Sequence, residues 1–157
     1  MKPGHLPLSI DVAIEADIWS DKPQARDEEW EEWIAAQLAP LFTLSDFRLG
    51  ELSIALTNDG HMQTLNNQYR GKDASTNVLS FPASGPLLGD IVLSHDTLAR
   101  EASAKSAPFL AHMSHLLIHG FLHLQGYDHQ DEASAAEMEA IEITALAALG
   151  IDNPYEK

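Results

Sequence analysis

Hydrophobic and polar residues alternate in two stretches of the chain, which predicts a β-strand at each. The stretches are LSIDVAIE (8–15) and ELSIALT (51–57), in which every second residue is apolar. This is the pattern of a strand that buries one face. Two shorter apolar runs, TNVLSFP (76–82) and GDIVLS (89–94), predict two further strands. We therefore expect a small sheet of four strands.

Apolar residues at helical spacing predict helices in most of the remaining chain. One helix begins near Asp27, a suitable N-cap with acidic residues behind it, and ends near Pro40. A short helix follows the second strand and stops at Gly71. We interpret the apolar stripe of the first helix as core, its tryptophans included; it comprises Trp30, Trp33, Ile34 and Leu38. Three more helices are expected, at about 96–105, 108–125 and 132–149.

The predicted order is strand, helix, strand, helix, two strands and three helices. This order indicates an α+β fold in which one small mixed sheet packs against helices gathered in the C-terminal half. There is no internal repeat, low-complexity tract or linker, so we expect residues 1–157 to form a single domain. The loop 83–89 is the best candidate for a mobile segment.

Composition and charge narrow the functional classes. The chain has no cysteine, which excludes disulfides, thiolate metal sites and thiol nucleophiles. The formal net charge of −15 argues against non-specific binding to nucleic acid. We interpret the acidic residues in 26–33 and after Asp128 as solvated helix faces. The basic pair Arg70 and Lys72 has few acidic neighbours in the sequence.

The N-terminus and the overall hydropathy predict a cytoplasmic protein. Asp11 and Glu15 interrupt an apolar run that is already too short for a signal peptide. No stretch is long and apolar enough to span a membrane.

The segment HLLIHGFLHLQGYDH (115–129) holds four of the eight histidines. On a helix, His119 and His123 project from one face about 6 Å apart along the axis, where they can bind one metal ion. Gly126 can then reverse the chain and bring His129 to the same ion. Three imidazoles suit zinc and leave a fourth position for water, which is typical of a catalytic site.

These residues fall on the H-x-x-x-H-x-x-G-x-x-H frame of metzincin peptidases, with one departure. Those enzymes place a glutamate, the general base, directly after the first histidine, and this chain has Gly120 there. His115 either supports a ligand or only packs beside it, and Asp128 either assists the site or only forms a turn. We expect the remaining histidines to be surface residues, namely His5, His61, His95 and His112.

At this point the chain resembles the YbeY family of endoribonucleases. HGFLHLQGYDH (119–129) matches the family signature H-G-x-L-H-L-x-G-Y-D-H, and NNQYRGKDASTNVLSFP (66–82) matches a second block. LGDIVLS (88–94) and MEAIEITALAALGI (138–151) are also similar to the family. The resemblance covers about residues 58–151. Asn77 stands where the family frequently has aspartate.

The resemblance implies a zincin-like α+β fold and one zinc ion on His119, His123 and His129. It implies a metal-dependent endoribonuclease that cleaves single-stranded RNA, matures the 3′ end of 16S rRNA and acts in ribosome quality control. It also singles out Arg70. A guanidinium is a suitable partner for a phosphoryl group that gains negative charge, and Lys72 could assist it.

Two other functions stay open from the sequence. One is a metallohydrolase for another substrate class, such as peptides, although Gly120 removes the usual base. The other is a ribosome-assembly factor whose zinc is mainly structural. For this factor, contacts with the small subunit or its associated proteins would supply the affinity that an acidic surface lacks.

Overall fold

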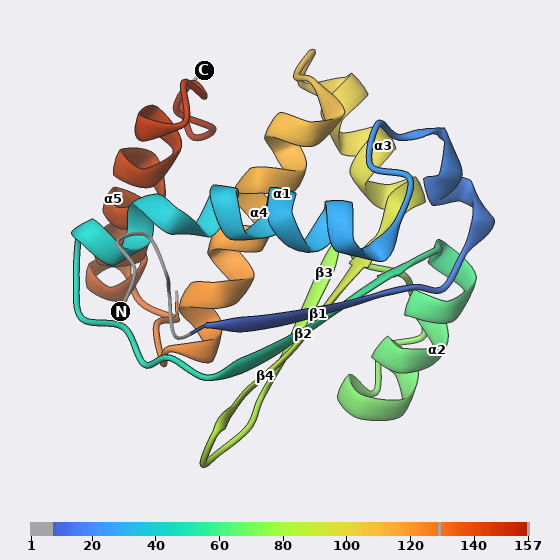
Figure 1. Cartoon of the computed structure of the whole chain (residues 1–157), viewed down its shortest axis with the longest axis horizontal. Coiled ribbons are helices and arrows are strands. Elements are labelled where there is room, and N and C mark those ends of the chain that lie inside the picture. The colour runs from blue at the N-terminus through green and yellow to red at the C-terminus, as the bar shows by residue number, and fades with distance from the viewer. Residues whose placement is uncertain (1–7, 129, 157) are drawn as a thin grey trace.

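The computed structural model describes residues 8–128 and 130–156 and contains a four-stranded mixed sheet with helices on both faces (Figure 1). The strand order is β1-β2-β4-β3, in which β1, β2 and β4 are parallel and β3 is antiparallel to β4. The predicted α+β fold class is therefore confirmed. The strands are β1 (Ser9–Ile14), β2 (Glu51–Thr57), β3 (Val78–Pro82) and β4 (Leu87–Ser94).

Each predicted helix is present within one to four residues of its expected bounds. Two 3₁₀ helices add to them, η1 (Asp17–Asp21) and η2 (Ala39–Thr43), and η2 follows the first long helix directly, with Pro40 in its first turn. The long helices are α1 (Asp27–Leu38), α2 (Asp59–Arg70), α3 (His95–Ala104), α4 (Phe109–Leu124) and α5 (Glu132–Ala148).

The loop predicted at 83–89 is shorter than expected, because β4 begins inside it. Leu87 pairs with Glu51 of β2, and Gly89 pairs with Pro82 of β3. The chain turns between Ala83 and Pro86 and forms a β-hairpin. Backbone pairing on both sides of β4 therefore orders residues whose composition alone predicts a loop.

The main core lies between the sheet and the layer that contains α1 and α4. The apolar positions of the alternating strands point into it, and α1 contributes the fully buried Trp30. Trp30 packs edge to face against Trp19 of η1, whose indole donates a hydrogen bond to the backbone oxygen of Thr57. The interpretation of Trp30, Ile34 and Leu38 as core is confirmed, while Trp33 is partly buried.

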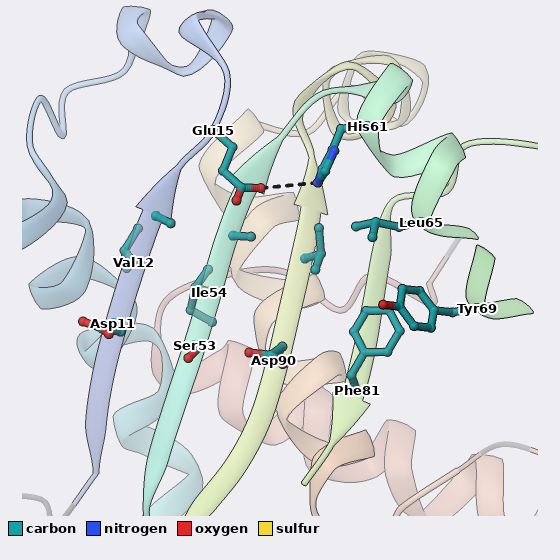
Figure 2. Close-up of a pocket in the computed structure, with 13 residues that line it drawn as sticks. Asp11, Val12, Glu15, Ser53, Ile54, His61, Leu65, Tyr69, Phe81 and Asp90 are labelled. Carbon is teal, nitrogen blue, oxygen red and sulfur yellow. Dashed lines mark ion pairs between the residues drawn. The ribbon is translucent and has the colours of Figure 1, made fainter. Parts of the chain in front are cut away.

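The opposite face of the sheet is covered only in part, by α2. Met62 of α2 is buried against Leu79 and Val92. Beside it the strands line a hollow of about 630 Å³, which we call the open sheet face (Figure 2). Polar side chains stand in a row across β1, β2 and β4, and aromatic residues from α2 and β3 form one wall. The row is Asp11, Ser53 and Asp90, and the wall contains Tyr69 and Phe81.

Two of the histidines expected at the surface are buried, so that expectation is wrong for His95 and His112. His95 packs against the rings of Trp19 and Phe109, at 5.1 and 4.9 Å between centroids. His112 is covered where α3 meets α4. Burial lowers the pKa of both imidazoles, which favours their neutral forms. The expectation is confirmed for His61, and His5 lies outside the described residues.

Within the described ranges, no helix combines the length and the apolar character that crossing a membrane requires.

Candidate metal centre and RNA-binding cleft

One face of α4 carries four histidines in a row. They occur at intervals of three, four and four residues, which keeps them on one side of a helix; they are His112, His115, His119 and His123. Pro108 precedes the helix in an extended conformation, and the chain reverses after it at Gly126, whose φ is +97°. The prediction that Gly126 ends this helix is confirmed.

Beside the histidine row, α4 lies close to the sheet at position 120. A Cβ atom on Gly120 would lie 3.1 Å from Ser80 Oγ and 3.3 Å from two atoms of Ile91. Ser80 also donates a hydrogen bond to the Gly120 carbonyl. A side chain at position 120 would therefore point toward β3 and β4, and the Ser80 and Ile91 side chains would have to shift to make room for it.

His119 and His123 present two ring nitrogens to a single point. Their Nε2 atoms are 3.0 Å apart. His123 Nδ1 is 3.0 Å from the Tyr127 carbonyl oxygen, and His119 Nδ1 is 2.8 Å from Glu142 Oε2. Since a carbonyl and an ionised carboxylate only accept hydrogen bonds, both Nδ1 atoms must donate, and in the neutral imidazoles the lone pairs of both Nε2 atoms face each other.

This donor set fits a shared cation. At Zn–N bond lengths of about 2.0–2.1 Å, two ligands of a tetrahedral ion lie roughly 3.3 Å apart, close to the observed separation. Each imidazole also donates its other N–H to an oxygen, which is the usual support of a metal-bound histidine. His129, the third predicted ligand, lies outside the described residues.

Glu142 of α5 is a fully buried carboxylate next to this pair. It accepts hydrogen bonds from His115 Nε2 at 2.7 Å, from His119 Nδ1 at 2.8 Å and from the Tyr155 hydroxyl. Burial raises the pKa of Glu142, but these hydrogen bonds outweigh it and bring the pKa to about 2. Glu142 is therefore ionised at neutral pH. Together with His115 and His119 it forms a cluster that could hold a metal ion, with ligand atoms within 4.8 Å of one another.

Glu142 is not among the site residues that the sequence predicts. The acidic residues after Asp128 were expected on solvated helix faces, and for Glu142 this is wrong because that face of α5 packs against α4. A signal was available in the sequence. Glu142 lies on the same helical stripe as buried apolar residues, and a lone carboxylate in such a stripe needs a polar partner inside the protein; the stripe is Met138, Glu142, Ala145 and Leu146.

The two ring nitrogens border a cleft of about 750 Å³, which we call the histidine cleft. Several predicted site residues line it together: Arg70, Lys72, His119, His123 and Asp128. The structure thus places residues from α2 and from the loop after it around the same cleft as residues of α4. His115 does not line the histidine cleft and lies behind His119, against Glu142.

The end of α2 fixes the basic side of the histidine cleft. Gly71 adopts the left-handed conformation, with φ +69°, and closes the helix directly after Arg70. The buried Asn66 side chain donates to Ala74 O at 2.8 Å, and the Asn66 backbone oxygen accepts from Lys72 N, so both groups hold the following loop. Arg70 and Lys72 are exposed, and across 8–128 and 130–156 neither forms an ion pair.

Asp128 and Asn77 have identifiable structural contacts. Asp128 Oδ1 accepts a hydrogen bond from Gln130 N at 3.2 Å, which supports the turn before α5. Asn77 Nδ2 donates to both carboxylate oxygens of Glu101, at 3.0 and 3.3 Å, and Glu101 also contacts His112. An aspartate at position 77 would oppose Glu101 with a like charge, so asparagine suits this surrounding.

The chain is similar to known proteins over most of its length. The family model for Endoribonuclease YbeY matches residues 16–150. The Endoribonuclease YbeY of Bradyrhizobium sp. strain BTAi1 is 44% identical over 94% of this chain and 92% of its own length. That of Sphingopyxis alaskensis is 42% identical over 92% of this chain and 97% of its own length.

A solved structure is similar in fold. The solution structure of TM1509 from Thermotoga maritima superimposes with a TM-score of 0.56 at 19% identity, covering 94% of this chain and 99% of the other. The extent of the family match and the identity to curated relatives together establish the family. The chain belongs to the YbeY family of endoribonucleases.

Proposed function

We propose that this protein is a zinc-dependent endoribonuclease that cleaves single-stranded RNA in the histidine cleft. The observation that carries the proposal is the pair of imidazole Nε2 atoms 3.0 Å apart on a cleft whose other side holds Arg70 and Lys72. We further propose that its substrate is rRNA, that it matures the 3′ end of 16S rRNA, and that it acts in ribosome quality control in the cytoplasm.

In this proposal His119, His123 and His129 hold one zinc ion per chain. The contacts within the His115, His119 and Glu142 cluster are 2.7 and 2.8 Å, the length of hydrogen bonds to a charged group. In that cluster each histidine uses an N–H donor, whereas the His119 and His123 Nε2 atoms turn lone pairs toward each other. Glu142 and His115 therefore support the ligands, and Glu142 keeps the proton of His119 on Nδ1.

The residues around the proposed metal site would bind the phosphate, stabilise its charge and accept a proton. When bound, zinc would supply a Lewis acid that activates water near neutral pH and offsets charge on a phosphoryl oxygen. The Arg70 guanidinium can hold a phosphate by two parallel hydrogen bonds and stabilise the charge that develops during cleavage. Lys72 adds a second positive charge to the same side of the histidine cleft, and Asp128 could orient an imidazole or accept a proton.

The decisive experiment is an RNA cleavage assay with purified protein. Single-stranded RNA should be cut by the zinc-loaded protein, left intact after chelation, and cut again when zinc is restored, with duplex RNA as the control substrate. A zinc-loaded protein that binds pre-ribosomal particles but cuts no RNA would instead be an assembly factor with a structural metal. Cleavage of peptides but not RNA would indicate another metallohydrolase.

The charge of the chain bears on how the substrate is held. With nine lysines and arginines against 24 acidic residues, the protein can neutralise few phosphates. We propose that contacts with the small ribosomal subunit or its associated proteins provide the affinity that RNA alone does not. We also propose that residues 1–157 act as one domain.

A further inference from the structure

The segment after α5 brings a tyrosine hydroxyl to the buried carboxylate of Glu142. The Tyr155 side chain remains 40% exposed, yet its hydroxyl donates a short hydrogen bond to Glu142 Oε1. The same hydroxyl lies 3.1 Å from His115 Nε2. The Tyr155 ring also packs edge to face against the His115 ring, with centroids 5.4 Å apart. The tyrosine thus contacts both residues that stand behind His119.

The segment is held in place by contacts of its own. Gly150 has φ +78°, and Ile151 N donates to Leu146 O at 2.9 Å, so that α5 ends in a defined cap. Ile151 then packs against the main core. Asn153 Oδ1 accepts a hydrogen bond from Tyr155 N at 2.8 Å and closes a turn of the Asx type. These contacts fix the backbone of Tyr155 without any contribution from Glu142.

The hydroxyl completes the set of donors around the carboxylate. Glu142 Oε2 receives His119 Nδ1, and Oε1 receives His115 Nε2 and the Tyr155 hydroxyl. With all three donors in place the carboxylate has a single orientation, and this orientation decides where the His119 ring points. Without the tyrosine, Oε1 would keep one donor and the carboxylate could rotate away from His119.

We propose that Tyr155 is a positioning residue for the metal centre, which acts through Glu142 to hold the His119 ring toward His123. Docking of the C-terminal segment therefore completes the metal site. The inference rests on the proposed zinc site and adds a residue whose hydroxyl contacts Glu142 and His115. Loss of this support should weaken zinc binding, as loss of other groups that orient metal ligands does.

The test measures zinc affinity of the full-length protein by competition with a chromophoric chelator. Tyr155→Phe removes only the hydroxyl and should weaken zinc binding by about 10-fold or more. Asn153→Ala loosens the turn while keeping the hydroxyl and should give a smaller loss. Tyr69→Phe is the matched control, because Tyr69 is 60% exposed and lines the open sheet face; its zinc affinity should equal that of the wild type.

A second measurement separates positioning from general stability. The melting temperature of the zinc-free protein should stay within a few degrees for Tyr155→Phe. A variant that binds zinc as tightly as the wild type would overturn the inference, whether or not it melts earlier. If the wild type itself binds no zinc, the proposed zinc-dependent function fails instead, and the two failures are thereby distinguished.

Discussion

The histidine cleft and the open sheet face are hollows of similar size, about 750 and 630 Å³, and α2 contributes residues to both. Their chemistry differs. The histidine cleft joins two exposed cations, Arg70 and Lys72, to the converging nitrogens of His119 and His123. The open sheet face presents carboxylates across β1 and β4, and its histidine, His61, lies 3.6 Å from Glu15.

This difference shows why the size of a hollow does not identify an active site. A phosphodiester carries negative charge and gains more during cleavage, so cations and a Lewis acid stabilise its transition state. The carboxylates of the open sheet face would repel it. Of these two hollows, the histidine cleft combines positive charge with converging imidazole nitrogens, and the following predictions test that contrast.

Substitutions in the histidine cleft and on the open sheet face should differ most in their effect on zinc content. His123→Ala removes one of three proposed ligands and should reduce zinc from about one per chain to near zero, because two ligands hold the ion poorly. RNA cleavage should fall to background with it. Elemental analysis of the purified variant gives the answer. His61→Ala, on the open sheet face, is the matched control and should keep its zinc. Equal zinc in both variants would contradict the assignment.

Arg70→Ala should have the next largest effect, on the rate of cleavage. Loss of a preorganised donor to the phosphoryl charge should raise the barrier by about 2–4 kcal/mol, and Arg70→Lys should recover part of it. Single-turnover cleavage measures the effect, while zinc content and melting temperature should stay at wild-type values.

Arg26→Ala is the control for Arg70, since Arg26 pairs with Glu29 on the surface of the chain. It should cleave at the wild-type rate. A similar loss of rate in both variants would mean that general surface charge, rather than the position of Arg70, matters.

Asp59→Asn should lower stability, because Asp59 ties α2 to β4 and α3. Asp59 Oδ1 accepts hydrogen bonds from Ser75, Ser94 and Thr97, and Oδ2 accepts from Arg100 at 2.8 Å. Replacing the carboxylate should cost about 1–3 kcal/mol of unfolding free energy, measured by urea denaturation. Since α2 contributes to both hollows, a loss of stability without any loss of cleavage would show that the histidine cleft tolerates movement of this helix.

The stability lost in Asp59→Asn should depend on pH in a definite direction. Burial raises the pKa of Asp59, but the hydrogen bonds outweigh it, and the pKa lies below its ordinary value. The contribution to stability is therefore complete above the unfolded-state pKa of about 4 and is lost as the pH falls toward the lower folded-state value. The difference between wild type and Asp59→Asn should shrink in acid. If the stability difference between the two proteins grew below about pH 4, this would contradict a lowered pKa for Asp59 in the folded state.

Substitutions on the open sheet face should have the smallest effect, and the quantity to measure is the affinity for RNA. Asp11→Asn with Asp90→Asn should leave the affinity for single-stranded RNA nearly unchanged, because the proposed RNA-binding site is the histidine cleft. The wild-type affinity should be weak and should fall only gently with salt, since few phosphates are neutralised. Fluorescence anisotropy across a salt series measures both. A slope implying roughly six or more phosphate contacts, or strong binding gained by the double variant, would contradict this view.

Local features of the sequence were sufficient to predict the helices and strands and the pairing of His119 with His123. The spacing of His119 and His123 brings them together on any helix, and Gly126 provides the reversal that a residue with a Cβ atom would resist. Alternating residues likewise identified the strands. The helix bounds were predicted because capping residues and prolines act within a few residues of their position. Leu87 was predicted in a loop but lies in β4, since its pairing with Glu51 depends on residues distant in the sequence.

Only the tertiary structure decided what surrounds these elements. It placed Arg70 on the same cleft as the histidine pair, buried His95 and His112 against helices that the sequence does not place, and gave Glu142 its three donors. The reason is that helical spacing determines which residues share a face but not what that face packs against. The same carboxylate is a solvated surface group on an uncovered helix and an ionised, fully hydrogen-bonded support when α5 lies beside α4.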